Sequence, residues 1–350
     1  MPTLKRRRVA LIGLGMAATP HAKSLLDLKD RVEVAAACSR GEERRRAFAA
    51  RFPFPTTADL DAVVDDPAID AVLLLTPPSA RVDLVERLGR AGKHILMEKP
   101  VERTTAAATR IVEAAERAGI TLGIVFQHRF RQDSERLRAL IDAGALGDGL
   151  AAAHVALPWW RPQAYYDEPG RGTLARDGGG VLLSQAIHTL DLMLSLTGPA
   201  REVAAVAGTT RLHRMETEDF VGAGLRFANG ALGALMATTA EYPGFPERIE
   251  LVGTRATAVL AGGDLSVFHH HDGRTERFGE EQRTGGGADP MDFPHDAHRA
   301  VLTDFLDALD EGRSTRECGP EALKVHRFID ALLRSSAERR AVEVEGEAAR

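Results

Sequence analysis

The chain has 350 residues, enough for two domains, and its 45 Lys and Arg against 50 Asp and Glu give a net charge of −5. Hydrophobic residues make up 44% and charged residues 27%, which excludes disorder or a coiled coil for the whole chain, and the weak acidity gives no support for binding nucleic acid. Two cysteines exclude a disulfide framework, and no apolar run approaches the roughly 20 residues that span a bilayer, so we expect a cytoplasmic protein without membrane contact.

The first apolar run, VALIG at 9–13, follows four basic residues at 5–8. Secretion signals have this order too. We interpret the run as a β-strand, because the glycines that follow it have a chemical use that cleavage would remove.

Apolar runs and amphipathic segments alternate from residue 9 to residue 126. Strands are predicted at 9–13, 32–38, 71–75, 94–97 and 121–126, and helices near 17–28, 41–51, 80–91 and 104–118. Continuous apolar strands separated by helices indicate βαβ units and a parallel sheet that is buried on both faces.

The turn after the first strand, GLGMAA at 13–18, matches the pattern G-x-G-x-x-G/A. Gly13 permits the tight turn, and Gly15 lets the backbone of Met16 and Ala17 approach a pyrophosphate at the start of the next helix. Its place at the start of a βαβ series predicts dinucleotide binding. A purely structural glycine turn is the alternative.

The residues at the end of the second strand indicate which cofactor is preferred. NAD-binding sites usually carry a carboxylate here for the ribose 2′-OH, but this chain has Ser39 and Arg40. A hydroxyl and a guanidinium suit a 2′-phosphate, so we expect NADP in preference to NAD. The alternative is that Arg40 only begins the exposed face of the next helix.

Two further segments follow strands of the same series. Thr76, Pro77 and Pro78 form a stiff turn that can wall a cofactor cleft, although such a turn alone indicates only a loop. Glu98 and Lys99 follow the strand at 94–97. From its position alone, Lys99 is as compatible with a surface lysine as with a group in acid–base chemistry.

The pattern changes after about residue 130. A helix at 131–143 and a strand near 150–157 are followed by an apolar helix near 180–196, several strands between 201 and 278, a loop at 284–294 and helices at 295–311 and 320–338. This predicts a mixed or antiparallel sheet with helices on one face. The strands at 221–227 and 231–239 carry apolar residues on both faces, so the second face needs a partner and we expect a homo-oligomer.

Polar and aromatic side chains gather in this second part. Trp159, Trp160, Arg161, Tyr165 and Tyr166 suit a sugar ring and an anion, or else core packing. In the apolar helix, Ser184, His188 and Asp191 share one face. A histidine there is by itself more often a packed core residue. The histidines at 269–271 beside Asp272 predict a solvated turn rather than a metal site, and no metal is expected.

In order, GLGMAA, TPPS, EKP and GGGVLLSQAIHTLD resemble the motifs of the Gfo/Idh/MocA oxidoreductases, over about residues 7–340. The resemblance implies an N-terminal Rossmann domain, here 1–126, and a C-terminal α/β domain with a large open mixed or antiparallel sheet, here 127–350. It also implies hydride transfer between NAD(P) and a sugar, polyol, sugar acid or related hydroxy or keto compound. The alternatives are a non-enzymatic dinucleotide-binding regulator and a redox-neutral glycosidase that uses NAD.

The resemblance also implies roles for residues. Lys99 and His188 become the catalytic pair that binds the reacting oxygen and moves its proton. Ser184 stands where inositol dehydrogenase-like members often have Asp, which argues against a myo-inositol site. The remaining cofactor contacts fall on Glu98, Lys99, Gln127 and Arg129, and the remaining substrate contacts on Trp160, Arg161, Tyr165, Ser184, Gln185 and Asp191. Members of the family commonly form dimers or tetramers, so the resemblance also implies a homodimer or homotetramer.

Overall fold

The computed structural model describes residues 6–279 and 294–346. It divides into two compact units: Met1–Gln127 with Pro294–Leu323, and His128–Phe293 with Lys324–Arg350. Apart from Pro294, the loop expected at 284–294 lies outside the described residues. Within them, no helix is both long and apolar enough to cross a membrane.

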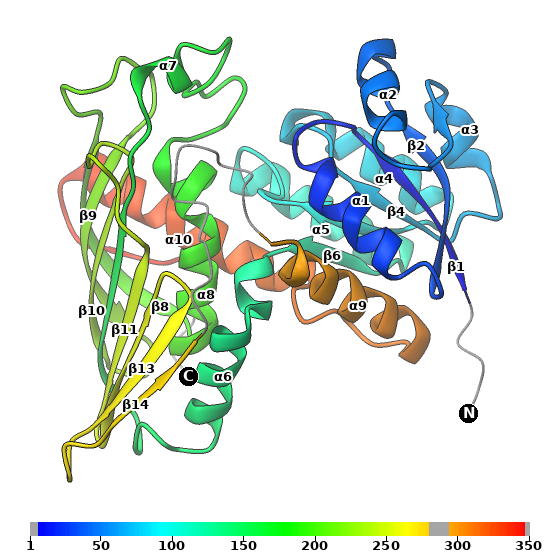
Figure 1. The fold of residues 1–350 in the computed structure, drawn as a ribbon. Helices are drawn as coiled ribbons and strands as arrows, with labels where there is room; N and C mark the ends of the chain where they lie inside the picture. The colour runs from blue at the N-terminus through cyan, green and yellow to red at the C-terminus, as the bar shows by residue number, and fades with distance from the viewer. Residues whose placement is uncertain (1–5, 280–293, 347–350) are drawn as a thin grey trace. The chain divides into compact units, whose positions relative to one another are not determined.

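A six-stranded parallel sheet forms the core of the first unit (Figure 1). Its order is β3-β2-β1-β4-β5-β6, the arrangement typical of dinucleotide-binding folds. The strands are β1 (Arg7–Ile12), β2 (Val32–Cys38), β3 (Thr56–Thr57), β4 (Ala71–Leu74), β5 (His94–Glu98) and β6 (Leu122–Val125). The chain order reverses between β1 and β4, and ligands bind at the carboxyl ends of strands beside such a point.

Helices cover the sheet of the first unit. They are α1 (Ala18–Asp27), α2 (Glu42–Ala49), α3 (Leu60–Asp65), α4 (Val82–Arg90), α5 (Thr105–Ala118) and α9 (Asp296–Glu311), with the short 3₁₀ turns η1 (Pro78–Ala80) and η2 (Gln127–Phe130). Although α9 comes late in the chain, it packs beside α1, where the rings of His21 and His298 meet edge to face with centroids 5.2 Å apart. The predicted parallel sheet is confirmed, whereas β3 and α3 were not predicted.

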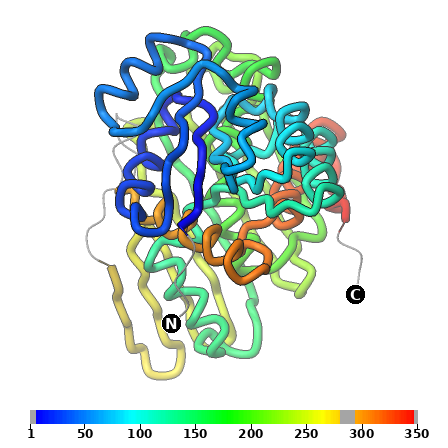
Figure 2. The backbone as a smooth tube through the Cα atoms, turned by 90° about the vertical axis from the view of Figure 1, so that its right-hand side faces the viewer, coloured from blue at the N-terminus to red at the C-terminus, as the bar shows by residue number. Residues whose placement is uncertain are grey.

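A nine-stranded sheet forms the core of the second unit, in the order β14-β13-β12-β11-β7-β10-β9-β8-β15. Only β7 and β10 pair in parallel, so the predicted mixed, mostly antiparallel sheet is confirmed. Figure 2 shows β12 to β14 as a yellow meander at one edge, and His270 and His271 lie exposed in its last turn, as predicted. The strands are β7 (Leu150–Pro158), β8 (Ala200–Gly208), β9 (Phe220–Phe227), β10 (Leu232–Thr238), β11 (Arg248–Gly253), β12 (Ala256–Ala261), β13 (Asp264–His269), β14 (Thr275–Phe278) and β15 (Val342–Glu343).

Helix α10 (Gly319–Glu338) lies along β8 near one edge of this sheet, where Ser335 and Ser336 Oγ accept backbone N–H groups of β8 at 2.9 and 2.7 Å. One face of the sheet is covered by α6 (Gln132–Asp142) and α8 (Ile187–Thr197) (Figure 1). Leu225 and Leu235 are buried beneath them. The opposite face keeps apolar side chains in solvent, with Val206 72% and Leu232 52% exposed. The expected helix at 180–196 is in fact two elements, because a π-helical turn, η3 (Leu182–Ala186), precedes α8.

Candidate active site

The turn after β1 has the geometry that a pyrophosphate needs. Gly13 has φ +105°, and a Cβ there would lie 2.7 Å from the carbonyl carbon of Leu75, so only glycine fits. Nothing stands within 4 Å of the Cβ position of Gly15. Within the described chain the N–H groups of Met16 and Ala17 donate to no other group, and α1 has neither a side-chain cap nor an acidic first turn. A dinucleotide therefore fits this turn.

The end of β2 carries more positive charge than the sequence motif revealed. Ser39 is half-buried and Arg40 is exposed. Arg45, on α2, donates from one Nη to the carbonyls of both residues, at 2.6 and 2.8 Å. This second basic group was missed by sequence reasoning because only the turn between β2 and α2 brings it back to the strand end.

A buried arginine joins the loops that follow β4 and β5. Arg81 is 2% exposed and donates through Nε to the carbonyl of Thr76 at 3.0 Å. One Nη donates to the carbonyls of Glu98 and Pro100. Burial lowers the pKa of Arg81 to about 10, against the attraction of nearby carboxylates. Arg81 therefore fixes the backbone on both sides of Lys99, a role that sequence reasoning missed.

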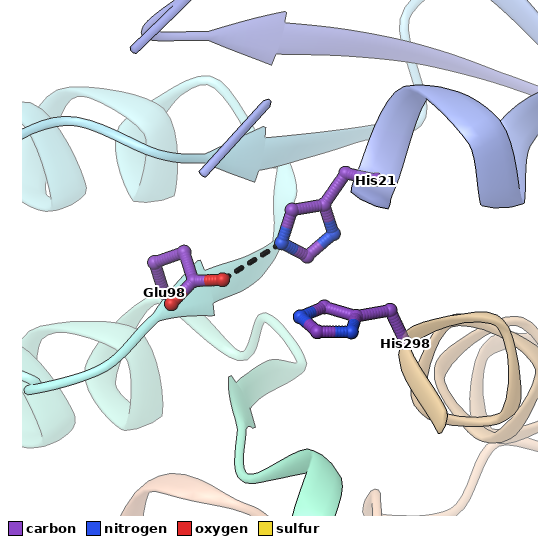
Figure 3. A group of neighbouring side chains, drawn as sticks. All are labelled: His21, Glu98 and His298. Carbon is purple, nitrogen blue, oxygen red and sulfur yellow. Dashed lines mark hydrogen bonds and ion pairs between the residues drawn. The ribbon is translucent and has the colours of Figure 1, made fainter. Parts of the chain in front are cut away.

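Glu98 lies in a buried polar cluster with His21 and His298 (Figure 3). Its Oε1 is 2.8 Å from His21 Nε2, and its Oε2 accepts the Lys99 N–H at 3.2 Å. Burial alone would raise the pKa of Glu98, but the bond from His21 and the neighbouring positive groups lower it to about 2. Two imidazoles and a carboxylate are metal-ligand types. We interpret them as hydrogen-bonded support, because Glu98 binds His21 and the Lys99 backbone directly.

Lys99 follows directly on β5, at the carboxyl edge of the sheet. It is half-buried, and burial lowers its pKa although Glu98 attracts the charged form. A lysine whose pKa is lowered toward neutrality is better suited to proton transfer than an exposed one.

His188 lies at the start of α8 and is 9% exposed. Its ring stacks on that of His128, with centroids 4.9 Å apart. His128 Nε2 in turn lies 2.7 Å from Arg131 Nη2. This stack fixes the plane of the His188 ring, and neither His128 nor Arg131 was singled out as its support from the sequence.

Arg129 and Asp191 bind each other. The guanidinium makes two hydrogen bonds to the carboxylate, at 2.7 and 2.5 Å, and Asp191 is 1% exposed. The sequence assigned Arg129 to the cofactor and Asp191 to the substrate. Because both oxygens of Asp191 are occupied, the pair holds α8 against the segment before α6 and so positions His188.

The aromatic cluster divides into a packed half and an open half. Tyr166 is buried with its hydroxyl 2.6 Å from Thr239 Oγ1, and burial raises its pKa to about 12. His213, which sequence reasoning missed, lies between Asp219 Oδ2 at 2.7 Å and the Arg161 carbonyl at 2.8 Å. Trp160 and Tyr165 are only half-buried. Core packing therefore describes Tyr166, while Trp160 and Tyr165 keep accessible surface.

The π-helical turn brings Gln185 to this cluster. Gln185 Nε2 lies 3.5 Å from Tyr165 Oη, whereas Ser184 Oγ donates to the carbonyl of Gly179 at 3.3 Å. Of the two neighbours, Gln185 thus shares a site with the aromatic residues. Gln127, half-buried, ends the first of the two segments that form the first unit.

Both halves of the chain match models of one protein family. The model described as "Oxidoreductase family, NAD-binding Rossmann fold" matches residues 7–126, and "GFO/IDH/MocA C-terminal domain" matches residues 134–259. The chain belongs to the Gfo/Idh/MocA family. The resemblance of its motifs to this family is therefore confirmed.

Its relatives within the Gfo/Idh/MocA family include named dehydrogenases. Myo-inositol 2-dehydrogenase of Thermotoga maritima is 27% identical over 71% of this chain and 73% of the relative. The NADP⁺-dependent scyllo-inositol 2-dehydrogenase IolW of Bacillus subtilis is 24% identical over 97% and 96%. The WlbA dehydrogenase of Bordetella pertussis, solved with NADH and UDP-GlcNAcA, is 26% identical, has a TM-score of 0.82 and is matched over 98% of this chain and 100% of that one. The predicted NAD(P)-dependent dehydrogenase is confirmed.

Proposed function

We propose that this dehydrogenase oxidises a secondary alcohol of a sugar-like compound, or reduces the matching ketone, with Lys99 and His188 at the reacting oxygen. The observation that carries the proposal is the setting of Lys99. Its charge is partly desolvated, its pKa is lowered, and Arg81 and Glu98 fix the backbone around it. A bound nicotinamide supplies or accepts the hydride.

Proton transfer is the contribution of the protein. Lys99 donates a hydrogen bond to the substrate oxygen and exchanges the proton that hydride transfer requires. His188, held flat against His128, supplies a second proton-carrying group. Trp160 and Tyr165 offer apolar ring faces to the sugar, and the names of the relatives as inositol, apiose and levoglucosan dehydrogenases support this substrate class.

We also propose NADP as the preferred cofactor. Ser39 offers a hydroxyl, and Arg40 and Arg45 place two guanidinium groups beside it. A 2′-phosphate gains charge-assisted hydrogen bonds there, and a 2′-OH does not.

Two further proposals concern the whole protein. A homodimer or homotetramer forms through the second sheet, which leaves Val206 and Leu232 exposed on its outer face. The location is cytoplasmic, which agrees with two cysteines, Cys38 and Cys318, that form no disulfide.

A cofactor screen tests the proposed function. Purified protein is mixed with NADP⁺ or NAD⁺ and a panel of sugars, sugar acids and polyols, and nicotinamide reduction is followed by absorbance. We expect reduction with at least one member, and reduction at least about 10²-fold slower with Lys99→Met. Reduction that persists at a normal rate in Lys99→Met would contradict the role of Lys99. A substrate consumed without net cofactor reduction would favour a redox-neutral reaction.

A further inference from the structure

In the part of the chain that the structure describes, Arg161 is a buried cation without a counter-charge. The residue is 6% exposed, and its one hydrogen bond from the guanidinium goes from Nη1 to the carbonyl of Trp160, at 2.9 Å. Among the described residues it has no carboxylate partner. Burial lowers its pKa, and the nearby Arg171 lowers it further. Because a buried, unpaired charge costs several kcal/mol, an arginine in this state needs a reason to be there.

The neighbours of Arg161 have unused polar atoms as well. The guanidinium carbon lies 5.2 Å from the ring centroid of Trp159 and 5.8 Å from that of Tyr165. Arg161 Nε, Trp159 Nε1 and Gln185 Oε1 are all buried without a hydrogen-bond partner. Two donors and one acceptor thus remain unsatisfied in one cluster. Because buried polar groups are nearly always hydrogen-bonded, three unsatisfied atoms beside one unpaired guanidinium favour a ligand site at this cluster.

The backbone of Arg161 is fixed before any ligand arrives. Its N–H donates to the carbonyl of Thr239 at 2.9 Å, and its own carbonyl is bound by His213 Nε2 at 2.8 Å. His213 is held in turn by Asp219. Rigid support of this kind holds a binding group in place, so little ordering is needed when the ligand binds.

Arg171 provides an internal comparison. It lies over the ring of Tyr165 at 4.2 Å, close to Arg161, but pairs with Glu168 at 2.6 Å. The structure therefore neutralises one arginine of this cluster and leaves the more deeply buried one uncompensated. The missing negative charge has to come from outside the described chain.

We propose that Arg161 binds a carboxylate of the substrate, so that the enzyme acts on a sugar acid rather than on a neutral sugar. This inference rests on the proposed function and narrows its substrate class. Nε and Nη2 lie on one edge of the guanidinium and present two parallel N–H groups, which match the two oxygens of a carboxylate. Trp159 Nε1 donates to a ligand oxygen, and Gln185 Oε1 accepts from a ligand hydroxyl. Gln185 precedes His188 by three residues, which connects this subsite to the proposed catalytic group.

Binding of matched compounds tests the proposal directly. Calorimetry with the cofactor-loaded protein compares the affinity of D-gluconate with that of D-glucitol, and the affinity of D-glucuronate with that of D-glucose. D-glucose 6-phosphate is compared with the two acids. We expect at least one acid to bind at least 10-fold more tightly than its neutral counterpart. Arg161→Gln should lose about 10- to 100-fold of that affinity, the range of a charge-assisted hydrogen bond, and Arg161→Lys should keep part of it. Arg171→Gln is the matched control and should change it less than three-fold.

Thermal unfolding of the ligand-free variants separates a binding role from a structural one. Removing an uncompensated buried charge should leave Arg161→Gln as stable as the unmodified protein or more stable. A large loss of stability would overturn the proposal, because it would mean that Arg161 is already paired.

Other outcomes would also overturn it. They are equal binding of acids and neutral sugars, unchanged acid affinity in Arg161→Gln, or tighter binding of the phosphate than of both carboxylates. The same experiments distinguish a failure of the proposed function from a failure of the carboxylate subsite. Acids that bind through Arg161 without any hydride transfer contradict the function and leave the subsite standing, whereas turnover of neutral sugars alone removes only the subsite.

Discussion

The residues around the end of β5 hold the backbone of Lys99 in place. Arg81 binds the carbonyls on both sides of Lys99, and Glu98 accepts its N–H. Sequence motifs pointed to Lys99 itself. They did not point to Arg81, because a side chain that binds backbone carbonyls 17 and 19 residues away leaves no local pattern.

Substitution of the proposed catalytic pair should reduce turnover. Lys99→Met removes the charge and keeps the length, and His188→Asn keeps one hydrogen bond and removes the titration. Each should lower kcat at least about 10²-fold, because proton-transfer groups contribute about 10² to 10⁴-fold. The double variant should be far less than multiplicatively worse, since the two act as a unit. Steady-state kinetics gives kcat for the three variants, and cofactor titration is the control for intact cofactor binding. A near-normal kcat in either single variant would contradict the proposed role of that residue.

Glu98 should make stability depend on pH in the acid range. Its pKa is lowered from 4.5 to about 2, so its contribution is fully present above pH 4.5 and is lost as the pH falls toward 2. At neutral pH the shift corresponds to about 3 kcal/mol. Glu98→Gln should therefore lower the urea midpoint at pH 7 and flatten its dependence between these pH values. Glu113→Gln, on the exposed face of α5, is the control. If the urea midpoint of Glu98→Gln depended on acid pH as strongly as that of the unmodified protein, Glu98 would not be the source of the dependence.

Cofactor preference should be reversible at the end of β2. Ser39→Asp with Arg40→Ala introduces a carboxylate that repels a 2′-phosphate and accepts from a 2′-OH. The ratio of the NADP to the NAD dissociation constant should change by about one to two decades in favour of NAD. Fluorescence titration of both cofactors gives the ratio. If the unmodified protein already binds NAD more tightly, the NADP assignment is wrong.

At the scale of elements, strands and long helices were predictable where their apolar period was regular. β1, β2, β4, β5 and β6 all follow the predicted runs. The two-residue β3 and six-residue α3 are too short to carry a period. The π-helical turn η3 was missed for another reason. Its residues are as apolar as those of α8, so the change in hydrogen-bonding register leaves no trace in the pattern.

The start of the π-helical turn depends on a glycine. A Cβ on Gly180 would lie 1.8 Å from the backbone carbonyl oxygen of Glu218. The side-chain carboxylate of Glu218 accepts the N–H groups of Gly180 and Leu182 at 3.0 and 3.1 Å. Gly180→Ala must displace this backbone, and we expect a loss of at least about 1–3 kcal/mol in stability and a lower kcat. Gly149→Ala, where nothing lies within 4 Å, is the control for denaturant unfolding. Equal stability of the two variants would contradict the argument.

For the whole molecule, we propose that the outer face of the nine-stranded sheet forms the interface between subunits. Leu232→Lys with Val206→Lys places two charges on this face, and we expect the oligomer to dissociate to monomers in light scattering. Leu212→Lys is the control, because Leu212 is 56% exposed but lies in a turn outside the sheet. A monomeric mass of the unmodified protein at micromolar concentration would remove the proposal.

The sequence predicted both sheets and the nucleotide turn, but not the clusters that tertiary structure assembles. His213 binds Arg161, which lies 52 residues earlier in the chain. His21 contacts His298, although all but the last strand of the second sheet come between them in the sequence. Neither pair leaves a spacing that could be recognised in one sequence. Lys99 and His188 were proposed as the catalytic pair only because the motifs around them are those of the family.

The packing of α9 beside α1 has a consequence for biosynthesis. A ribosome delivers all six strands of the parallel sheet by residue 125, yet the helix that carries His298 emerges only after residue 296. Until then, the nascent first unit leaves the α9-facing side of His21 uncovered. The order of synthesis and the order of completion therefore differ, and a fragment that ends at residue 127 should be recognised by chaperones and proteases as unfinished.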